Sequence, residues 1–157
     1  MIKVHERLFV GDELDCRNNA SGIDIVHACK HPCHVNAVGY RDKLTSSHPN
    51  YLFIVKKDNL YLNMIDPPAP LFKIEMFHKF MEFMSIEWSA EKNILIHCNK
   101  GLSRAPSLAL LFMAKSLNII KSESFVAAKN DFASIYPAYD PGKGIQIFLE
   151  RNWHSIA

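Results

Sequence analysis

The stretch from Ile94 to Leu110 limits what this chain can fold into more than any other part of the sequence. It begins with an apolar run typical of a buried strand, breaks into a short polar segment, and resumes with apolar residues at helical spacing. A helix N-terminus offers unpaired backbone N–H groups, and a curled loop before it adds more. Strand, tight loop and helix in this order therefore predict an anion site, with Cys98 beneath the anion.

The rest of the chain supplies strands early and helices late. We expect strands within Ile2 to Gly11, Ile23 to Ala28, Tyr51 to Val55, Leu60 to Ile65 and Asn93 to His97. We expect helices over Asp12 to Asn18, His34 to Lys43, Leu71 to Trp88, Ser103 to Leu117, Ser122 to Phe132 and Ile145 to His154. Ser122 is a candidate cap of the fifth helix, and Pro32 predicts a loop after the strand that ends near Ala28. This succession predicts an α/β fold: a single central mixed sheet flanked by helices, with the phosphate-binding loop between a core strand and a helix.

Length and charge narrow the class of protein further. The 157 residues, 48% of them hydrophobic, fit one domain over 1–157 with a sizeable core. A formal charge of +2 without a basic block argues against nucleic-acid and membrane partners, and no apolar run is long enough to span a membrane. The N-terminus lacks the apolar core of a signal peptide, and the four cysteines show no disulfide spacing. We therefore expect a soluble, cytoplasmic protein with reduced thiols.

Cys98 and Arg104 are the candidate catalytic pair of the polar segment. A thiolate attacks phosphorus, and a helix N-terminus beside an arginine favours the thiolate over the thiol. Arg104 follows six positions later, where its planar guanidinium can take two phosphate oxygens at once, and Gly101 lets the loop turn tightly between them. These residues allow covalent catalysis, in which a phosphocysteine forms and water then hydrolyses it.

Asp66 is the candidate general acid. It lies 32 positions before Cys98, at the end of an expected strand, and the prolines that follow it stop that strand. A carboxyl group held exposed in this way can protonate a departing alcohol or phenol. An aspartate before prolines is also a common turn residue, and that reading stays open.

The segment His97-Cys98-Asn99-Lys100-Gly101-Leu102-Ser103-Arg104 resembles the His-Cys-x-x-Gly-x-x-Arg signature of the cysteine-dependent phosphatases. The size of the chain is similar to that of their dual-specificity branch, Asp66 matches the family's acid in spacing, and Tyr136-Pro137 is similar to the segment before its last helix. The resemblance implies that residues 99–104 bind phosphate. It also implies hydrolysis of phosphotyrosine, often with phosphoserine and phosphothreonine, on a phosphorylated protein or peptide, without a metal or cofactor.

The sequence departs from that family pattern at Ala105. The family usually carries serine or threonine directly after the arginine, and the hydroxyl helps the cysteine thiolate to leave when the intermediate breaks down. Gly-Leu-Ser-Arg-Ala-Pro resembles the phosphatases of regenerating liver, a subgroup that also has alanine there and turns over slowly; this similarity is local. We therefore expect hydrolysis of the phosphocysteine to limit turnover.

Other residues around the site have more than one interpretation. His97 is expected to orient the loop by hydrogen bonding, and Lys100 either attracts an anionic substrate or is a solvated loop charge. Tyr136, Tyr139 and Lys143 can rim the pocket. Cys29 ends a core strand, at a place similar to where some members of the family carry a cysteine that forms a reversible disulfide with the nucleophile; a buried structural cysteine is the alternative.

Two further alternatives concern metal and substrate. Five residues have the side chains of zinc ligands, but their spacing fits no common structural site, and we predict no metal: His27, Cys29, His31, Cys33 and His34. The same catalytic residues can also serve a phosphoinositide or an RNA 5′-triphosphate end, although the absence of a basic stripe disfavours RNA. A third alternative is a slow phosphatase or a pseudophosphatase that acts as a phosphate-dependent binding module and holds its partner, and Ala105 keeps this alternative open.

Overall fold

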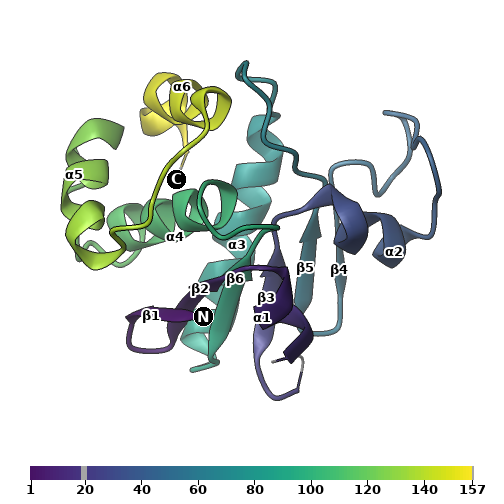
Figure 1. Cartoon of the computed structure of the whole chain (residues 1–157), viewed down its shortest axis with the longest axis horizontal. Coiled ribbons are helices and arrows are strands. Elements are labelled where there is room, and N and C mark those ends of the chain that lie inside the picture. Colours follow the sequence, from purple (N-terminus) through teal and green to yellow (C-terminus); the bar gives the residue numbers. More distant parts are fainter. Residues whose placement is uncertain (19–20, 157) are drawn as a thin grey trace.

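The computed structural model describes residues 1–18 and 21–156, and a mixed six-stranded sheet runs through its centre (Figure 1). In spatial order the strands are β1 (Ile2–His5), β2 (Leu8–Gly11), β6 (Ile94–His97), β3 (Asp24–His27), β5 (Asn59–Leu62) and β4 (Phe53–Lys56). The four inner strands are parallel, and each edge strand pairs antiparallel with its neighbour. The carboxyl ends of β2, β6 and β3 therefore lie side by side at one end of the sheet, and this is the edge at which such sheets bind ligands.

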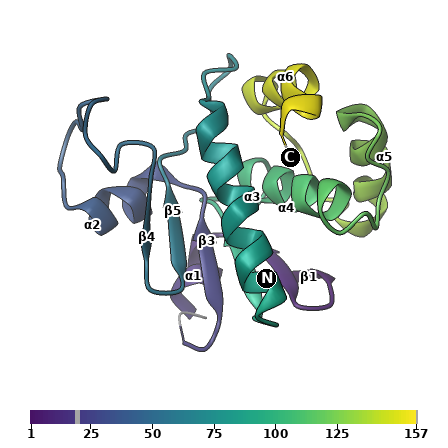
Figure 2. The ribbon, with the colours of Figure 1, turned by 180° about the vertical axis from the view of Figure 1, so that it is seen from behind.

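Helices cover both faces of this sheet. Their bounds are α1 Glu13–Asn18, α2 Val35–Val38, α3 Ile74–Ser89, α4 Arg104–Lys115, α5 Phe125–Ile135 and α6 Lys143–Asn152, with a π-helical turn η1 (Lys30–His34) before α2 and a 3-10 turn η2 (Trp153–Ser155) after α6. Helix α3 crosses one face, as Figure 2 shows, and α4 packs against β2 and β6. Helix α1 lies in front of the other face in Figure 1. No helix among the described residues is long and apolar enough to cross a membrane.

The two faces of the sheet differ in chemistry. Alternate strand residues point to opposite faces, and Val26, Ile94 and Ile96 belong to the main hydrophobic core with the buried side chains of α3 and α4. The residues that alternate with these three along β3 and β6 point to the opposite face of the sheet. Each of the two strands ends in a buried histidine, which is His27 in β3 and His97 in β6. Because the register pairs these two histidines side by side, a polar cluster forms on the α1 side, under the edge where ligands bind.

The predicted fold class is confirmed, and the expected elements are present with three local differences. The expected helix His34 to Lys43 is the shorter α2, which ends at Gly39 with a φ of 95°. The predicted loop at Pro32 instead holds η1, with His31 extended, as a residue before proline must be. Helix α5 begins after Ser124, not Ser122: the Ser124 hydroxyl accepts the Ala127 N–H at 3.1 Å and so satisfies a free donor of the first turn.

Asp24 makes the stability of the fold depend on pH. The side chain is 4% exposed at the start of β3, and its Oδ2 has no hydrogen-bond partner among the described residues. Burial raises the pKa of Asp24 to about 7 from an ordinary 3.8. A hydrogen bond with Glu87 and the charges of Glu87 and Asp58 add to this shift, although the charge of Lys92 opposes it. The folded state thus favours the protonated form, and stability falls as the pH rises from about 4 to about 7.

We expect Asp24→Asn to stabilise the protein at pH 8 and to change stability little at pH 4. At pH 8 an ionised Asp24 must be held in the fold, and the shift from 3.8 to about 7 sets an upper bound of about 4 kcal/mol on its cost. Urea denaturation at both pH values measures the difference, and Asp58→Asn, at an exposed position of the same cluster, is the matched control with a smaller effect. An equal gain at both pH values would show that the ionisation of Asp24 is not the cause.

Candidate active site

The segment from Cys98 to Arg104, called the phosphate loop below, joins the end of β6 to the start of α4. Cys98 is 2% exposed, and the backbone N–H of Ala105, in the first turn of α4, donates to its Sγ at 3.4 Å. The positive end of the helix dipole therefore faces the sulfur. This arrangement suits an anion bound above Cys98.

Carbonyl groups of the phosphate loop point outward. Three outer groups donate to them: the Tyr136 hydroxyl to Gly101 at 2.7 Å, the Asp140 N–H to Leu102 at 2.8 Å and the Glu13 N–H to Asn99 at 3.4 Å. In a trans peptide the C=O and the N–H of the next residue point in opposite directions. The N–H groups of Lys100, Leu102 and Ser103 therefore face the inside of the loop, where they can donate to phosphate oxygens.

Gly101 of the phosphate loop lies close to Gly11 at the end of β2. Gly101 has a φ of 72°, in the left-handed region that favours glycine. A Cβ built on Gly101 would lie 3.0 Å from the Gly11 carbonyl oxygen, and the Cys98 N–H donates to the same oxygen at 3.4 Å. The end of β2 thus supports the outer side of the loop.

Arg104 is held over the loop with one donor unused. Its guanidinium donates to the Met64 carbonyl at 2.9 Å and to the Asn99 side-chain oxygen at 2.7 Å. Its Nε is buried and has no hydrogen-bond partner among the described residues. A buried donor without an acceptor is costly, and a phosphate oxygen inside the loop would supply that acceptor.

A cavity of about 520 Å³ opens over the phosphate loop. It is lined by Asp66, Cys98, Asn99, Lys100, Leu102, Ser103, Arg104, Asp140, Pro141 and Gly142. The exposed Asp66 therefore shares one cavity with the predicted nucleophile and arginine. A Cβ added to Gly142 would collide with the Asp66 carboxylate, so this glycine leaves the room that the acid occupies.

The connector before α6 contributes residues that the sequence did not single out. Asp140, Pro141 and Gly142 line the cavity, and the Gly142 N–H donates to the Ser103 hydroxyl at 2.8 Å. The residues expected at the rim, Tyr136, Tyr139 and Lys143, are not among the lining residues. Burial raises the pKa of Tyr136, with the charge of Cys98 adding to the effect, so its hydroxyl stays a donor to the back of the loop.

The remaining predicted residues lie around this centre. His97 is fully buried, and its Nδ1 lies 3.2 Å from the carbonyl oxygen of Cys98, which fits the expected orienting role. Lys100 is exposed at the mouth of the cavity. Cys29 is buried after β3, and a hydrogen bond with Cys33 lowers the pKa of its thiol while burial opposes this. All four cysteines are free thiols, and pairing of Cys29 with Cys98 stays a prediction.

Of the five residues noted for their zinc-ligand side chains, two come together in the structure. His27 and Cys33 lie in one cluster, whose other members are Cys16 of α1 and His97 of β6. His34 instead contacts the Tyr40 hydroxyl at 2.8 Å and the Asn50 carbonyl oxygen at 2.9 Å. His97 is far from the others in the sequence, and the pairing of β3 with β6 brings it beside His27, whereas Cys16 reaches the cluster from α1.

Comparison with known proteins was made by sequence and by structure. No family model and no curated protein sequence matches the chain. Human DUSP28 superposes with a TM-score of 0.66 at 15% identity, over 98% of this chain and 93% of its own. The human tyrosine phosphatase-like serine/threonine/tyrosine-interacting protein gives 0.67 at 16%, over 98% and 95%, and the Cydia pomonella PTP-2 phosphatase gives 0.65 at 18%, over 96% and 88%. The chain therefore has the fold of the dual-specificity phosphatases.

Proposed function

We propose that this protein is a cysteine-dependent phosphomonoester hydrolase, a protein-tyrosine or dual-specificity phosphatase that acts through a phosphocysteine. The observation that carries the proposal is the phosphate loop: Cys98 lies beneath inward-facing N–H groups, and Arg104, whose Nε has no partner among the described residues, lines the same cavity. These donors fit three oxygens of a phosphoryl group. The fold shared with phosphatases supports the same conclusion.

The proposed reaction has two steps. In the first, the Cys98 thiolate attacks phosphorus, the bond to the ester oxygen breaks, and Asp66 gives a proton to the departing alcohol or phenol. In the second, water attacks the phosphocysteine, Asp66 takes up a proton, and the thiolate leaves. Arg104 and the loop N–H groups stabilise the charge on the equatorial oxygens in both steps.

We propose a phosphorylated protein or peptide as the substrate. The cavity combines the donors of the loop with the apolar surfaces of Leu102 and Pro141, a combination that suits an aryl phosphate. The exposed Lys100 at its mouth can attract an anionic substrate. The four free thiols support a reducing, cytoplasmic compartment.

A pre-steady-state assay with an aryl phosphate tests the proposal. We expect a burst of phenol equivalent to one turnover of each molecule, because the first step does not depend on a hydroxyl at position 105. A slower steady release should follow, and phosphate and vanadate should inhibit it. Release of no phenol above the protein-free rate, from folded and reduced protein, would overturn the proposal and favour a module that only binds phosphate.

We expect Ala105→Ser to raise kcat by about tenfold and to leave the burst unchanged. Ala105 is fully buried and supplies its backbone N–H to Cys98, but no side-chain hydroxyl for the departing thiolate. A hydrogen bond to a charged group contributes about 1.5–3 kcal/mol, of which about 1.4 already gives a tenfold rate. Stopped-flow release of phenol separates the two phases.

Ala105→Gly is the matched control for this variant. It changes the volume at the same buried position and adds no donor, so its steady rate should stay at or below that of the wild type. An unchanged or lower kcat in Ala105→Ser with a normal burst would show that breakdown of the intermediate does not limit turnover.

A further inference from the structure

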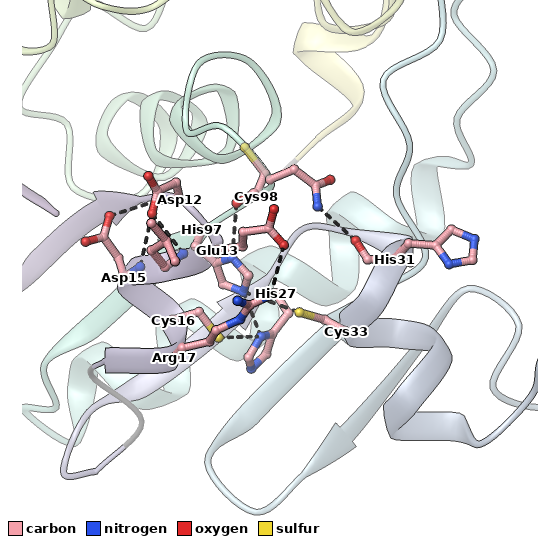
Figure 3. A network of polar contacts seen from close by, with 12 residues as sticks. Asp12, Glu13, Asp15, Cys16, Arg17, His27, His31, Cys33, His97 and Cys98 are labelled. Carbon is pink, nitrogen blue, oxygen red and sulfur yellow. Dashed lines mark hydrogen bonds and ion pairs between the residues drawn. The ribbon is translucent and has the colours of Figure 1, made fainter.

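Four potential metal ligands converge under the phosphate loop, on the face of the sheet that carries α1 (Figure 3). Cys16 comes from α1, His27 from the end of β3, Cys33 from η1 and His97 from the end of β6. Their four ligand atoms all lie within 4.8 Å of one another. Two thiols and two imidazoles are the donor set of a structural zinc site.

Hydrogen bonds of the two histidines turn their lone pairs toward each other. His27 Nε2 lies 2.9 Å from the Asn59 side-chain oxygen, and His97 Nδ1 lies 3.2 Å from the Cys98 carbonyl oxygen. Because both oxygens are acceptors, each ring uses its N–H there. His27 Nδ1 and His97 Nε2 therefore both carry lone pairs, and they lie 2.7 Å apart. Two lone pairs at this distance repel each other unless a cation lies between them.

The positions of the two sulfur atoms indicate which cation fits the site. Cys16 Sγ lies 3.5 Å from His27 Nδ1, and Cys33 Sγ lies 3.8 Å from His97 Nε2. With Zn–S near 2.3 Å and Zn–N near 2.05 Å, a tetrahedral site has sulfur–nitrogen edges of about 3.5 Å and a nitrogen–nitrogen edge of about 3.3 Å. These two sulfur–nitrogen edges agree with the ideal site to within about 0.3 Å, the remaining edges are all within 4.8 Å, and small ring rotations would separate the nitrogens by the missing 0.6 Å or so. A proton between the rings would bridge the two nitrogens alone, whereas a metal ion would also use both sulfurs as ligands.

We propose that Cys16, His27, Cys33 and His97 bind one zinc ion in tetrahedral coordination. Each thiol loses its proton to solvent on binding, so two thiolates and two neutral imidazoles neutralise the charge of Zn²⁺. A neutral site suits the place, because His97 is fully buried and His27 is 5% exposed. The hydrogen bonds of the imidazoles to Asn59 and Cys98 have the form that usually orients histidine ligands.

The zinc ion would hold together the elements that support the phosphate loop. The Asn99 carbonyl oxygen of that loop accepts a hydrogen bond from the Glu13 N–H of α1. The Asn99 side chain donates to the His31 carbonyl of η1 at 2.8 Å. Cys16 lies on α1 and Cys33 on η1, so the ion fixes both neighbours of Asn99, the residue that positions Arg104. The site is thus structural, and it acts on the loop through positioning.

Metal analysis of the full chain tests this proposal. The protein is expressed with added zinc, purified with a reductant and without chelator, and assayed for metal by mass spectrometry. We expect about one zinc per chain in the wild type and well below half of that in Cys16→Ser and Cys33→Ser. The controls are Cys29→Ala and Cys98→Ser, at the two buried cysteines outside the cluster, and both should keep the metal.

Cobalt gives a second readout that does not need a folded variant. Co²⁺ added to metal-free wild-type protein should produce the thiolate charge-transfer and intense visible bands of tetrahedral coordination. Absence of both zinc and these bands, or peptide mapping that finds a Cys16 to Cys33 disulfide in the reduced preparation, would overturn the proposal. Loss of metal from Cys98→Ser to the extent seen in Cys16→Ser would also overturn it, since the ion would then sit at the catalytic thiol.

This proposal stands or falls separately from the phosphatase activity. A Cys98→Ser protein that keeps zinc and loses hydrolysis supports both proposals. A hydrolase without metal refutes the zinc site alone, and a zinc protein without hydrolysis refutes the proposed function alone.

Discussion

Cys98→Ser should lower the turnover of an aryl phosphate by about 10⁴-fold or more, the largest effect that we expect from any single substitution. The serine hydroxyl is a far weaker nucleophile than a thiolate, and a helix N-terminus cannot ionise a hydroxyl at neutral pH. Initial rates with a chromogenic aryl phosphate, measured under reducing conditions, give the comparison.

Binding of inorganic phosphate is the control for this variant. The inward N–H groups and Arg104 do not depend on the sulfur atom, so Cys98→Ser should still bind phosphate with an affinity close to that of the wild type. If the variant binds phosphate and keeps more than a few per cent of the activity, Cys98 is not the nucleophile and the proposed mechanism is wrong.

Asp66→Asn should lower kcat/KM by about 10²-fold or more on a phenyl or alkyl phosphate, within the range that general acids contribute. The amide cannot give up a proton to a basic leaving group. The loss should shrink for a nitrophenyl phosphate, whose phenolate leaves without protonation. Rates across a series of leaving groups therefore measure this role, because a merely structural loss would lower all of them alike.

Two further variants show whether the acid is Asp66. Asp140→Asn removes the other carboxylate that lines the cavity and should leave the dependence on the leaving group unchanged. Gly142→Ala places a methyl group where the Asp66 carboxylate lies, so it should reproduce part of the Asp66→Asn effect without removing the acid. If Asp140→Asn has the larger effect on poor leaving groups, the acid has been assigned to the wrong residue.

The central part of the fold could be predicted from the sequence because the local signals and the tertiary structure agree there. The apolar run before Cys98 forms β6, and α4 begins at Arg104, within one residue of the expected start. Agreement was poorer around Pro32, where a π-helical turn replaces the expected loop. A proline constrains itself and its predecessor, but it does not say how the next residues pack against the sheet.

The residues that line the cavity were named from the sequence where they are close in the sequence or resemble a known signature. Asp140 and Gly142 were missed because nothing in an irregular connector indicates that it folds over the phosphate loop. The cluster of Cys16, His27, Cys33 and His97 was missed for a related reason. Its members are spread over 82 positions, counted from 16 to 97, and they converge only after β3 has paired with β6 and both α1 and η1 have packed beside these strands.

Detection of the covalent intermediate tests the central claim most directly. The wild-type protein is mixed rapidly with an aryl phosphate, denatured during the burst, and digested for peptide mass measurement. We predict one phosphoryl group on the peptide that carries Cys98, on a large fraction of the molecules because Ala105 slows its hydrolysis, and none in Cys98→Ser. A burst of phenol without a phosphopeptide, or with the phosphoryl group on another residue, would contradict the account.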